Sequence, residues 1–388
     1  MPSANAPYDP LDAQNLHNPY PVLAELRRTE PVFWHEGMAS WMLTRHADCV
    51  RVLRDHGLFA RDPRRTGGSV PEPSLSVQTL DPPQQNHVRS LFMTALRAQD
   101  LPAVEARARR LVASRLDALT RAGEFDVVAE LAVPLSVAVV ADLLGVEPPS
   151  YTEFAAVSDA IMQSMDGGLN PTLVEPGRIA RQQLSELVDS WFTASSRPGL
   201  LARVRQMAPS ADPHARLYVK NTARVMFQGG YSTMAAAIGN AVAVLLARPE
   251  ALERMRDPAL LATGVDELVR FDGPVQGTTR VAVRACRIGG VDVASGQKVV
   301  PLFAAANRDP AAFPGADRLV LERTPNPHLG YGWGPHSCVG TTVAQAGLRA
   351  LVAALVEHPA RLVAAGDGVR RRTATMRAFE TLPAFLHR

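Results

Sequence analysis

The segment that most constrains this chain is the stretch 330–340, Gly-Tyr-Gly-Trp-Gly-Pro-His-Ser-Cys-Val-Gly. It places Cys338 after three alternating glycines, a proline and a histidine, and directly before an apolar segment with helical spacing. Glycine permits backbone angles that are forbidden to other residues and allows close approach to a flat, bulky group. A buried cysteine beside a tight turn is the simplest alternative, but it does not account for the alternating glycines or for His336. The stretch therefore predicts a loop built around a reactive sulfur.

Cys338 is a candidate metal ligand. Its thiolate would be stabilised by N–H groups of the turn and by the N-terminus of the helix expected from about Val339. Such a thiolate is suited to be the axial ligand of a haem iron, where sulfur donates electron density that favours O–O cleavage. The other cysteines, Cys49 and Cys286, are distant in sequence and show no paired spacing. This spacing argues against a disulfide framework or a structural zinc site.

The stretch resembles the haem-binding loop of the cytochrome P-450 superfamily, Phe-Gly-x-Gly-x-His-x-Cys-x-Gly in soluble bacterial members. Tyr331 stands at the Phe position, and the matching residues are Gly332, Gly334, His336, Cys338 and Gly340. The resemblance extends over nearly the whole chain. It implies a mainly α fold with small β-sheets, a triangular helical prism around a buried haem b (iron protoporphyrin IX). We expect one domain over residues 1–388, with a sheet-rich lobe near the N-terminus and a helical lobe carrying the haem.

Composition is that of an ordinary soluble protein, with 46% hydrophobic and 20% charged residues. A net charge of +3 is too small to indicate nucleic-acid binding. The first residues lack a signal-peptide pattern, and the most apolar run, 131–146, is too short to span a bilayer. We therefore expect a cytoplasmic monomer with no membrane or nucleic-acid partner. No flavin or iron–sulfur module is recognisable, so electrons must come from another protein, which the resemblance implies is ferredoxin with its reductase.

Three residues stand at positions that contact haem propionates in the family, and two of them, Arg89 and Arg280, match it. The segment Asp81-Pro82-Pro83 opens a helix with proline in its first turn. It matches the family's Asp-Pro-Pro-x-His-x-x-x-Arg, with Arg89 at the arginine and Gln85 in place of the histidine. Gln85 would give one neutral hydrogen bond instead of a charge-assisted one. Arg280 matches the strand arginine that pairs with a propionate, and the resemblance implies that His336 holds one as well. Arg89 alone would be interpreted as a solvated charge.

A long apolar segment, 221–246, is interrupted by Gly229-Gly230. Glycine inside a helix costs about 1 kcal/mol relative to alanine, so the pair needs a reason. The resemblance supplies one, because the family's central helix opens a groove for dioxygen at Ala/Gly-Gly-x-Asp/Glu-Thr. Here Thr233 is retained and Ser232 replaces the acid. Thr233 would then hydrogen-bond dioxygen, and the alternative is a hydroxyl bonded to its own helix.

The resemblance also implies a substrate pocket and a structural ion-pair group. A long loop at 60–80, a lid interrupted at Gly167-Gly168, and a terminal hairpin within 373–383 would surround the pocket. The expected pocket residues are Phe227, Gly230, Val275, Gln276, Thr278 and Met376. Glu267 and Arg270, three residues apart on one helix face, match the family's Glu-x-x-Arg. With a later arginine, here Arg318, they would hold the region behind the haem loop.

Together these features imply a monooxygenase that uses O2 and an external electron donor. Its substrate would be a bulky natural-product intermediate in antibiotic or other secondary-metabolite biosynthesis, hydroxylated or epoxidised, either free or carrier-bound. Ser232 leaves two alternatives open, since serine relays protons only through water. One is oxidative ring formation or coupling without oxygen insertion, and the other is a haem-binding scaffold that has lost turnover. Retention of the complete cysteine loop favours an active enzyme.

Overall fold

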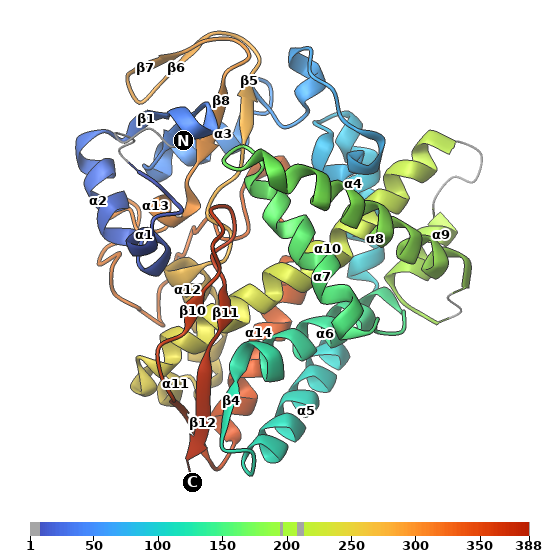
Figure 1. Ribbon diagram of the computed structural model, residues 1–388, viewed down its shortest axis with the longest axis vertical. Helices are drawn as coiled ribbons and strands as arrows, with labels where there is room; N and C mark the ends of the chain where they lie inside the picture. The colour runs from blue at the N-terminus through green and yellow to red at the C-terminus, as the bar shows by residue number, and fades with distance from the viewer. Residues whose placement is uncertain (1–7, 195–196, 208–212, 388) are drawn as a thin grey trace.

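The computed structural model describes residues 8–194, 197–207 and 213–387. These residues fold into a mainly helical structure with small sheets, as predicted (Figure 1). The helices are α1 Ala13–His17, α2 Tyr20–Thr29, α3 His46–Arg54, α4 Gln84–Arg97, α5 Leu101–Leu119, α6 Val133–Leu144, α7 Tyr151–Gln163, α8 Val174–Ala194, α9 Leu200–Met207, α10 Pro213–Leu246, α11 Pro249–Arg254, α12 Pro258–Asp272, α13 Phe303–Ala306 and α14 Thr341–Glu357.

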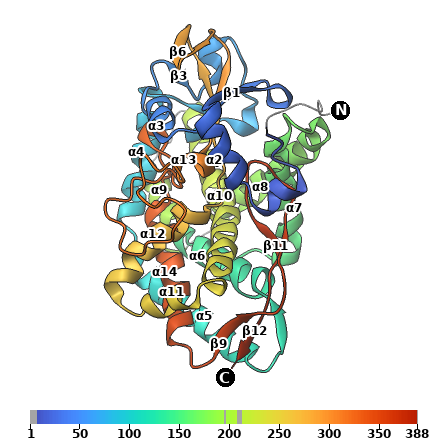
Figure 2. The ribbon, with the colours of Figure 1, turned by 90° about the vertical axis from the view of Figure 1, so that its left-hand side faces the viewer.

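The described strands form four small sheets. The largest has the order β1-β2-β8-β5-β3, with β2 and β8 parallel and the other pairs antiparallel. It lies at one end of the molecule, and the sheet β4-β12-β9 lies at the opposite end (Figures 1 and 2). The strands are β1 Val32–His35, β2 Ser40–Leu43, β3 Phe59–Ala60, β4 Glu124–Asp126, β5 Arg280–Ala282, β6 Cys286–Ile288, β7 Val291–Val293, β8 Lys298–Pro301, β9 Arg361–Ala364, β10 Val369–Arg370, β11 Phe379–Thr381 and β12 Pro383–His387.

Helix α10 runs through the middle of the helical part (Figures 1 and 2). It packs against α6, α8, α12 and α14, and its residues Phe227, Ile238 and Val242 are fully buried. It begins at Pro213, earlier than the predicted 221. Of the described helices, α10 is the one long and apolar enough to cross a membrane by length and composition, but 56% of its most apolar window is buried inside the protein. Contacts on several sides are the mark of a core helix.

The cysteine-containing loop lies between the N-terminal lobe and the helical part. Its short helix η8, Gly334–His336, packs on α3, and Gly340 is the N-cap residue of α14. Cys338 is thereby held just before a helix N-terminus, as the sequence predicts.

Hydrogen bonds join the segments that are expected to surround the pocket to α10 or to one another. In the loop 60–80, the Val77 N–H donates to Thr222 Oγ1 of α10 at 3.0 Å. Between α7 and α8, the buried Asp166 carboxylate accepts hydrogen bonds from the backbone N–H groups of Ala374 and Thr375, at 2.7 and 2.9 Å. The loop, the helix pair and the C-terminal hairpin therefore close over the same side of α10.

Candidate active site

The glycines of the cysteine-containing loop are required by its backbone. Gly332 and Gly334 have φ of 69° and 70°, a left-handed conformation that favours glycine. A Cβ at Gly334 would also lie 2.5 Å from the Leu53 carbonyl oxygen of α3. The loop is closed by the Cys338 N–H, which donates to the Tyr331 carbonyl at 2.7 Å. The sulfur position is thus fixed by main-chain geometry.

The Cys338 side chain is accessible although the protein around it is dense. Burial by this surrounding protein raises the pKa of the thiol. Both observations hold when the sulfur opens onto a cavity rather than onto bulk solvent. The Gly340 N–H, the Thr341 hydroxyl and the Arg89 charge all oppose the increase in pKa by stabilising the thiolate. Coordination to a metal would complete that deprotonation.

Three guanidinium groups beside this loop have no carboxylate partner. Arg89 donates to Ser337 Oγ at 3.0 Å, Arg280 to the Thr279 carbonyl at 2.9 Å, and Arg61 to Thr278 Oγ1. None of the three forms an ion pair with a carboxylate within the described ranges. Burial, reinforced by the nearby Arg61, lowers the pKa of Arg280 to about 9.

Clustered cations that are partly or fully buried are costly, and the nearby Asp81 carboxylate offsets only part of the charge of Arg61 and Arg280. The cluster therefore favours additional anionic groups. The two propionates of a haem held by Cys338 would supply them, and the residues present therefore fit a haem. Arg61, in the loop 60–80, is an addition that the sequence motifs did not single out.

His336 and Gln85 contact protein groups in this structure, and their role as direct propionate contacts stays a prediction. Gln85 Nε2 lies 2.9 Å from His336 Nδ1, and His336 Nε2 lies 2.9 Å from Asp81 Oδ1. If the glutamine amide donates, the imidazole proton is on Nε2 and both ring nitrogens are in use. Burial, together with the charges of Arg61 and Arg280, lowers the pKa of His336 to about 4 despite the bond to Asp81.

The Asp81 carboxylate accepts hydrogen bonds from several of these groups. Burial alone would raise the pKa of its carboxyl, but hydrogen bonds from His336 and from the N–H groups of Asp62 and Arg61 lower it well below its usual range. The carboxylate also forms an ion pair with Arg65 at 3.2 Å. Sequence reasoning quoted Asp81 only as the start of a helix motif, so its role was missed.

The two glycines of α10 have different surroundings. A Cβ on Gly230 would lie 2.9 Å from Val140 Cγ2 of α6, so that glycine allows two helices to approach. A Cβ on Gly229 would meet nothing within 4 Å. Open space therefore lies at the Cβ position of Gly229, whereas that of Gly230 is turned to α6. Gly230 remains partly accessible, and its place in the pocket stays a prediction.

The hydroxyl groups of Ser232 and Thr233 both donate back to their own helix. Ser232 Oγ donates to the Gln228 carbonyl at 2.7 Å, and Thr233 Oγ1 donates to the Gly229 carbonyl. Both side chains are only partly buried. The alternative of a back-bonded threonine is thus observed in this structure. To hydrogen-bond a ligand as a donor, either hydroxyl must leave its carbonyl.

Two of the predicted pocket residues lie together. Val275 and Met376 form an isolated antiparallel bridge, and Met376 packs with Ala236 of α10 and Ala378. This apolar group joins the α12–β5 connection, the C-terminal hairpin and the central helix. That Val275 and Met376 line a substrate cavity stays a prediction, and their contact with each other is consistent with it.

The remaining pocket predictions are corrected. Phe227 is fully buried between Phe154 and Trp191, with ring centroids 4.8 Å from each, so it is a core residue. Gln276 donates to the Gly273 carbonyl at 3.0 Å, and successive side chains of extended backbone point to opposite sides. It therefore does not share the side taken by Val275. The Thr278 hydroxyl accepts hydrogen bonds from the arginine cluster instead.

The predicted pair Glu267–Arg270 is present and wholly buried, with Nε–Oε2 and Nη2–Oε1 distances of 2.7 and 2.8 Å. The third arginine is not Arg318, whose contribution is a backbone carbonyl that accepts from Arg270 at 3.0 Å. Arg323 takes that place, with its Nε 3.0 Å from Glu267 Oε2. This corrects the prediction.

Tyr331 and Gly340 flank the sulfur. The Tyr331 hydroxyl is buried without a hydrogen-bond partner, and its ring lies against His328 with centroids 5.5 Å apart. A Cβ on Gly340 would lie 3.9 Å from Cys338 Sγ, an ordinary contact. Gly340 is therefore not required by close contact with the sulfur.

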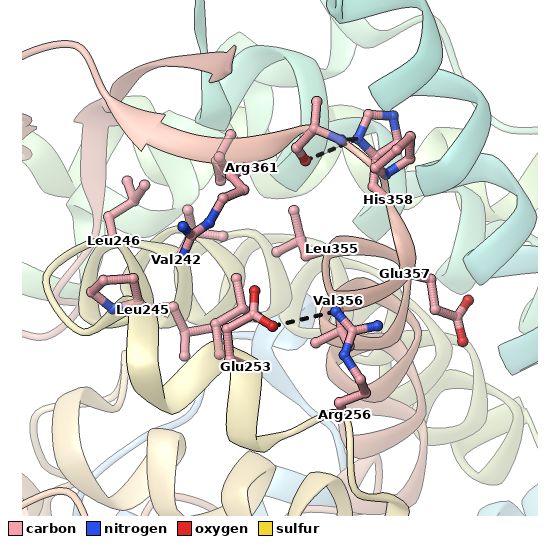
Figure 3. Close-up of a pocket in the computed structure, with 15 residues that line it drawn as sticks. Val242, Leu245, Leu246, Glu253, Arg256, Leu355, Val356, Glu357, His358 and Arg361 are labelled. Carbon is pink, nitrogen blue, oxygen red and sulfur yellow. Dashed lines mark hydrogen bonds and ion pairs between the residues drawn. The ribbon is translucent and has the colours of Figure 1, made fainter. Parts of the chain in front are cut away.

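A cavity of about 310 Å³ lies elsewhere (Figure 3). It is formed by the C-terminal ends of α10 and α14 together with α11 and β9, with Leu355 and Val356 among its apolar residues. The exposed pair Glu253–Arg256 lies at its edge (Figure 3). Because Cys338 precedes the opposite end of α14, roughly 20 Å away at 1.5 Å per residue, this cavity is separate from the candidate active site.

Comparisons with known proteins agree with this geometry. A family model described as Cytochrome P450 matches residues 200–360. The chain is 32% identical over 364 residues to Nocardicin C N-oxygenase of Nocardia uniformis subsp. tsuyamanensis, with 90% of each chain covered. It is 30% identical over 347 residues to Mycinamicin IV hydroxylase/epoxidase of Micromonospora griseorubida, with 86% of each covered. The crystal structure of CalO2 matches with a TM-score of 0.86 at 28% identity, covering 98% of each chain. A thiolate loop, a set of unpaired cations beside it and these matches lead to one conclusion: the chain belongs to the cytochrome P450 family.

Proposed function

We propose that this protein is a monooxygenase that hydroxylates or epoxidises a bulky natural-product intermediate in secondary-metabolite biosynthesis. Membership of the family gives the oxidoreductase class, haem iron as cofactor, a small-molecule substrate and a redox partner. Haem b, a ferredoxin with its reductase as electron donor, a single domain over 1–388, a monomeric state and a cytoplasmic location without membrane attachment are the finer parts of the proposal. The names of the relatives that act on nocardicin and mycinamicin support the substrate class.

The observation that carries the proposal is the accessible Cys338 sulfur beside three unpaired guanidinium groups. When bound, a thiolate-ligated haem supplies oxygen activation. Cys338 would hold the iron, and Arg61, Arg89 and Arg280 would hold the propionates. Tyr331, Gly332 and Gly340 would shape the proximal side around the sulfur.

Proton supply on the distal side falls to Ser232 and Thr233. Neither position carries an acid, and both hydroxyl protons are held by carbonyl groups. Thr233 Oγ1 can reach a ligand over Gly229 once it leaves the Gly229 carbonyl, and Ser232 can pass a proton only through water. This arrangement favours a second candidate, oxidative ring formation or coupling, in which the substrate supplies its own proton or no oxygen is inserted.

Three measurements on the haem-loaded protein test the proposal. The ferrous protein with carbon monoxide should show the red-shifted Soret band of thiolate ligation, and Cys338→Ser should lose it. Turnover with a ferredoxin donor separates an enzyme from a silent haem-binding scaffold. Product mass then separates oxygen insertion from coupling. A Cys338→Ser protein with an unchanged spectrum would contradict the ligand assignment.

Ser232→Asp and Thr233→Ala test the proton route. In ordinary hydroxylation, the restored acid should raise the rate, and a tenfold gain requires only about 1.4 kcal/mol of barrier. Thr233→Ala should divert electrons from product to peroxide. If neither substitution changes the ratio of product to electrons consumed, the ring-formation or coupling candidate takes precedence.

A further inference from the structure

Two arginines on the lid side of α10 have no counter-ion among the residues that the structure describes. Arg224 of α10 is only 4% exposed, donates through Nη2 to the Pro73 carbonyl, and has no partner for its Nε–H. Arg181 of α8 donates through Nη2 to Ser164 Oγ at 2.6 Å. No carboxylate within residues 8–194, 197–207 and 213–387 forms an ion pair with either guanidinium.

Among the buried arginines in the described part of the chain, only Arg224 and Arg280 lack an ion-pair partner. Arg270 and Arg377, equally well buried, each contact a carboxylate. Burial, reinforced by the nearby Arg181, lowers the pKa of Arg224 to about 10, so both groups remain charged at neutral pH. A buried charge that lacks a counter-ion and has a like charge nearby destabilises the protein until an anion binds.

The position of the pair is suited to a substrate. Arg224 precedes Thr233 on the same helix by nine residues, which is about 14 Å along the axis and half a turn around it, so Arg224 faces α8 and the loop 60–80 rather than the side that bears Thr233. The loop 60–80, which Arg224 contacts at Pro73, is also joined to α10 through Asn221 and Thr222. The pair thus lies among the segments that close over α10, at a molecule's length from the candidate site of oxidation.

We propose that Arg181 and Arg224 bind a carboxylate or phosphate group at the end of the substrate remote from the oxidised carbon. This assignment rests on the proposed function. A bidentate guanidinium is the group best suited to either anion. A carboxylate would mark a free acid substrate, and a phosphate would mark a phosphorylated one or a phosphate-containing carrier arm.

The test uses the haem-loaded protein and four probes of equal chain length: dodecanoate, dodecyl phosphate, dodecanol and dodecyltrimethylammonium. Binding is measured by calorimetry and by the change in the Soret band. At least one anion should bind about tenfold more tightly than the alcohol, with the cation weakest. Arg181→Gln and Arg224→Gln should each remove this preference. Arg178→Gln is the matched control, because Arg178 is an exposed arginine on the same helix, paired with Glu175 at 2.7 Å.

The thermal stability of Arg224→Gln is a second test of the proposal. Without anions, Arg224→Gln should unfold at the same temperature as the wild type or higher, because it removes an uncompensated charge. Equal binding of anions and alcohol by the wild type, or a large loss of stability in Arg224→Gln, would overturn the inference. If the carbon monoxide spectrum shows no thiolate signature, the proposed function fails instead, and calorimetry still reports whether the anions bind.

Discussion

The carboxylate of Glu267 should be the most costly single group to neutralise in this protein. Its two oxygens accept two hydrogen bonds from Arg270, one from Arg323 Nε at 3.0 Å, and one from the Val320 N–H at 2.9 Å. Asn326 Nδ2 approaches at 3.3 Å. Glu267→Gln keeps the shape but places an amide N–H2 against guanidinium groups. Arg270 and Arg323 then lose the only carboxylate that they contact within the described ranges.

Removing one partner of a buried pair costs about 3–5 kcal/mol, out of a typical total stability of about 5–15 kcal/mol. Glu267→Gln should therefore give little soluble haem-loaded protein and a much lower urea midpoint by circular dichroism. Glu253→Gln is the matched control, since Glu253 and Arg256 have the same spacing but are about half exposed. Exposed pairs contribute about 1 kcal/mol at most. Equal midpoint shifts in the two variants would refute the reasoning.

Two further predictions concern α10 and a second buried carboxylate. Gly229→Ala should stabilise the fold by up to about 1 kcal/mol, because alanine has the higher helix propensity. Gly230→Ala should destabilise the fold by about 1–2 kcal/mol, because the added Cβ would contact Val140. A lower urea midpoint for Gly229→Ala than for Gly230→Ala would contradict both expectations. Burial alone would raise the pKa of Asp272, but the charges of Arg377 and Arg370 lower it overall. The ionised Asp272 therefore stabilises the fold above its unfolded pKa, and this stabilisation is lost as pH falls through its folded pKa. The difference in free energy of unfolding between the wild type and Asp272→Asn should narrow below about pH 4. A difference that does not change with pH would rule this out.

The sequence predicted the main features of the cysteine-containing loop because backbone requirements are local. Alternating glycines before Cys338 specify left-handed turns, and two of them have that conformation. The pair Glu267–Arg270 was different, since the chain contains the same Glu-x-x-Arg spacing at 25–28, 175–178 and 253–256. Those three pairs are exposed and only the fourth is buried. The spacing alone could not show which of the four pairs is buried, whereas the resemblance to the family identified Glu267–Arg270.

Other errors came from contacts that are distant in the chain. Arg318 and Arg323 lie in the same loop between α13 and α14, and only the fold determines which of them points its side chain at Glu267. Phe227 lies on α10 near the glycines, but α7 and α8 cover its face. A sequence shows that a helix is apolar all round, and it does not show which neighbour each face meets. Corrections of this kind therefore concentrate on side-chain direction rather than on the existence of elements.

The buried arginines can be sorted by what neutralises them, and this sorting says more about function than the net charge of +3. Arg270 and Arg377 have carboxylates from the chain itself, and they hold the fold together. Arg280 has none and lies beside the cysteine-containing loop, where a cofactor with two carboxylates fits. Arg224 also has none, but it lies too far along α10 for the same cofactor to serve it. Since a folded chain rarely buries a charge without a counter-ion, each unpaired arginine indicates an anion that the chain does not encode.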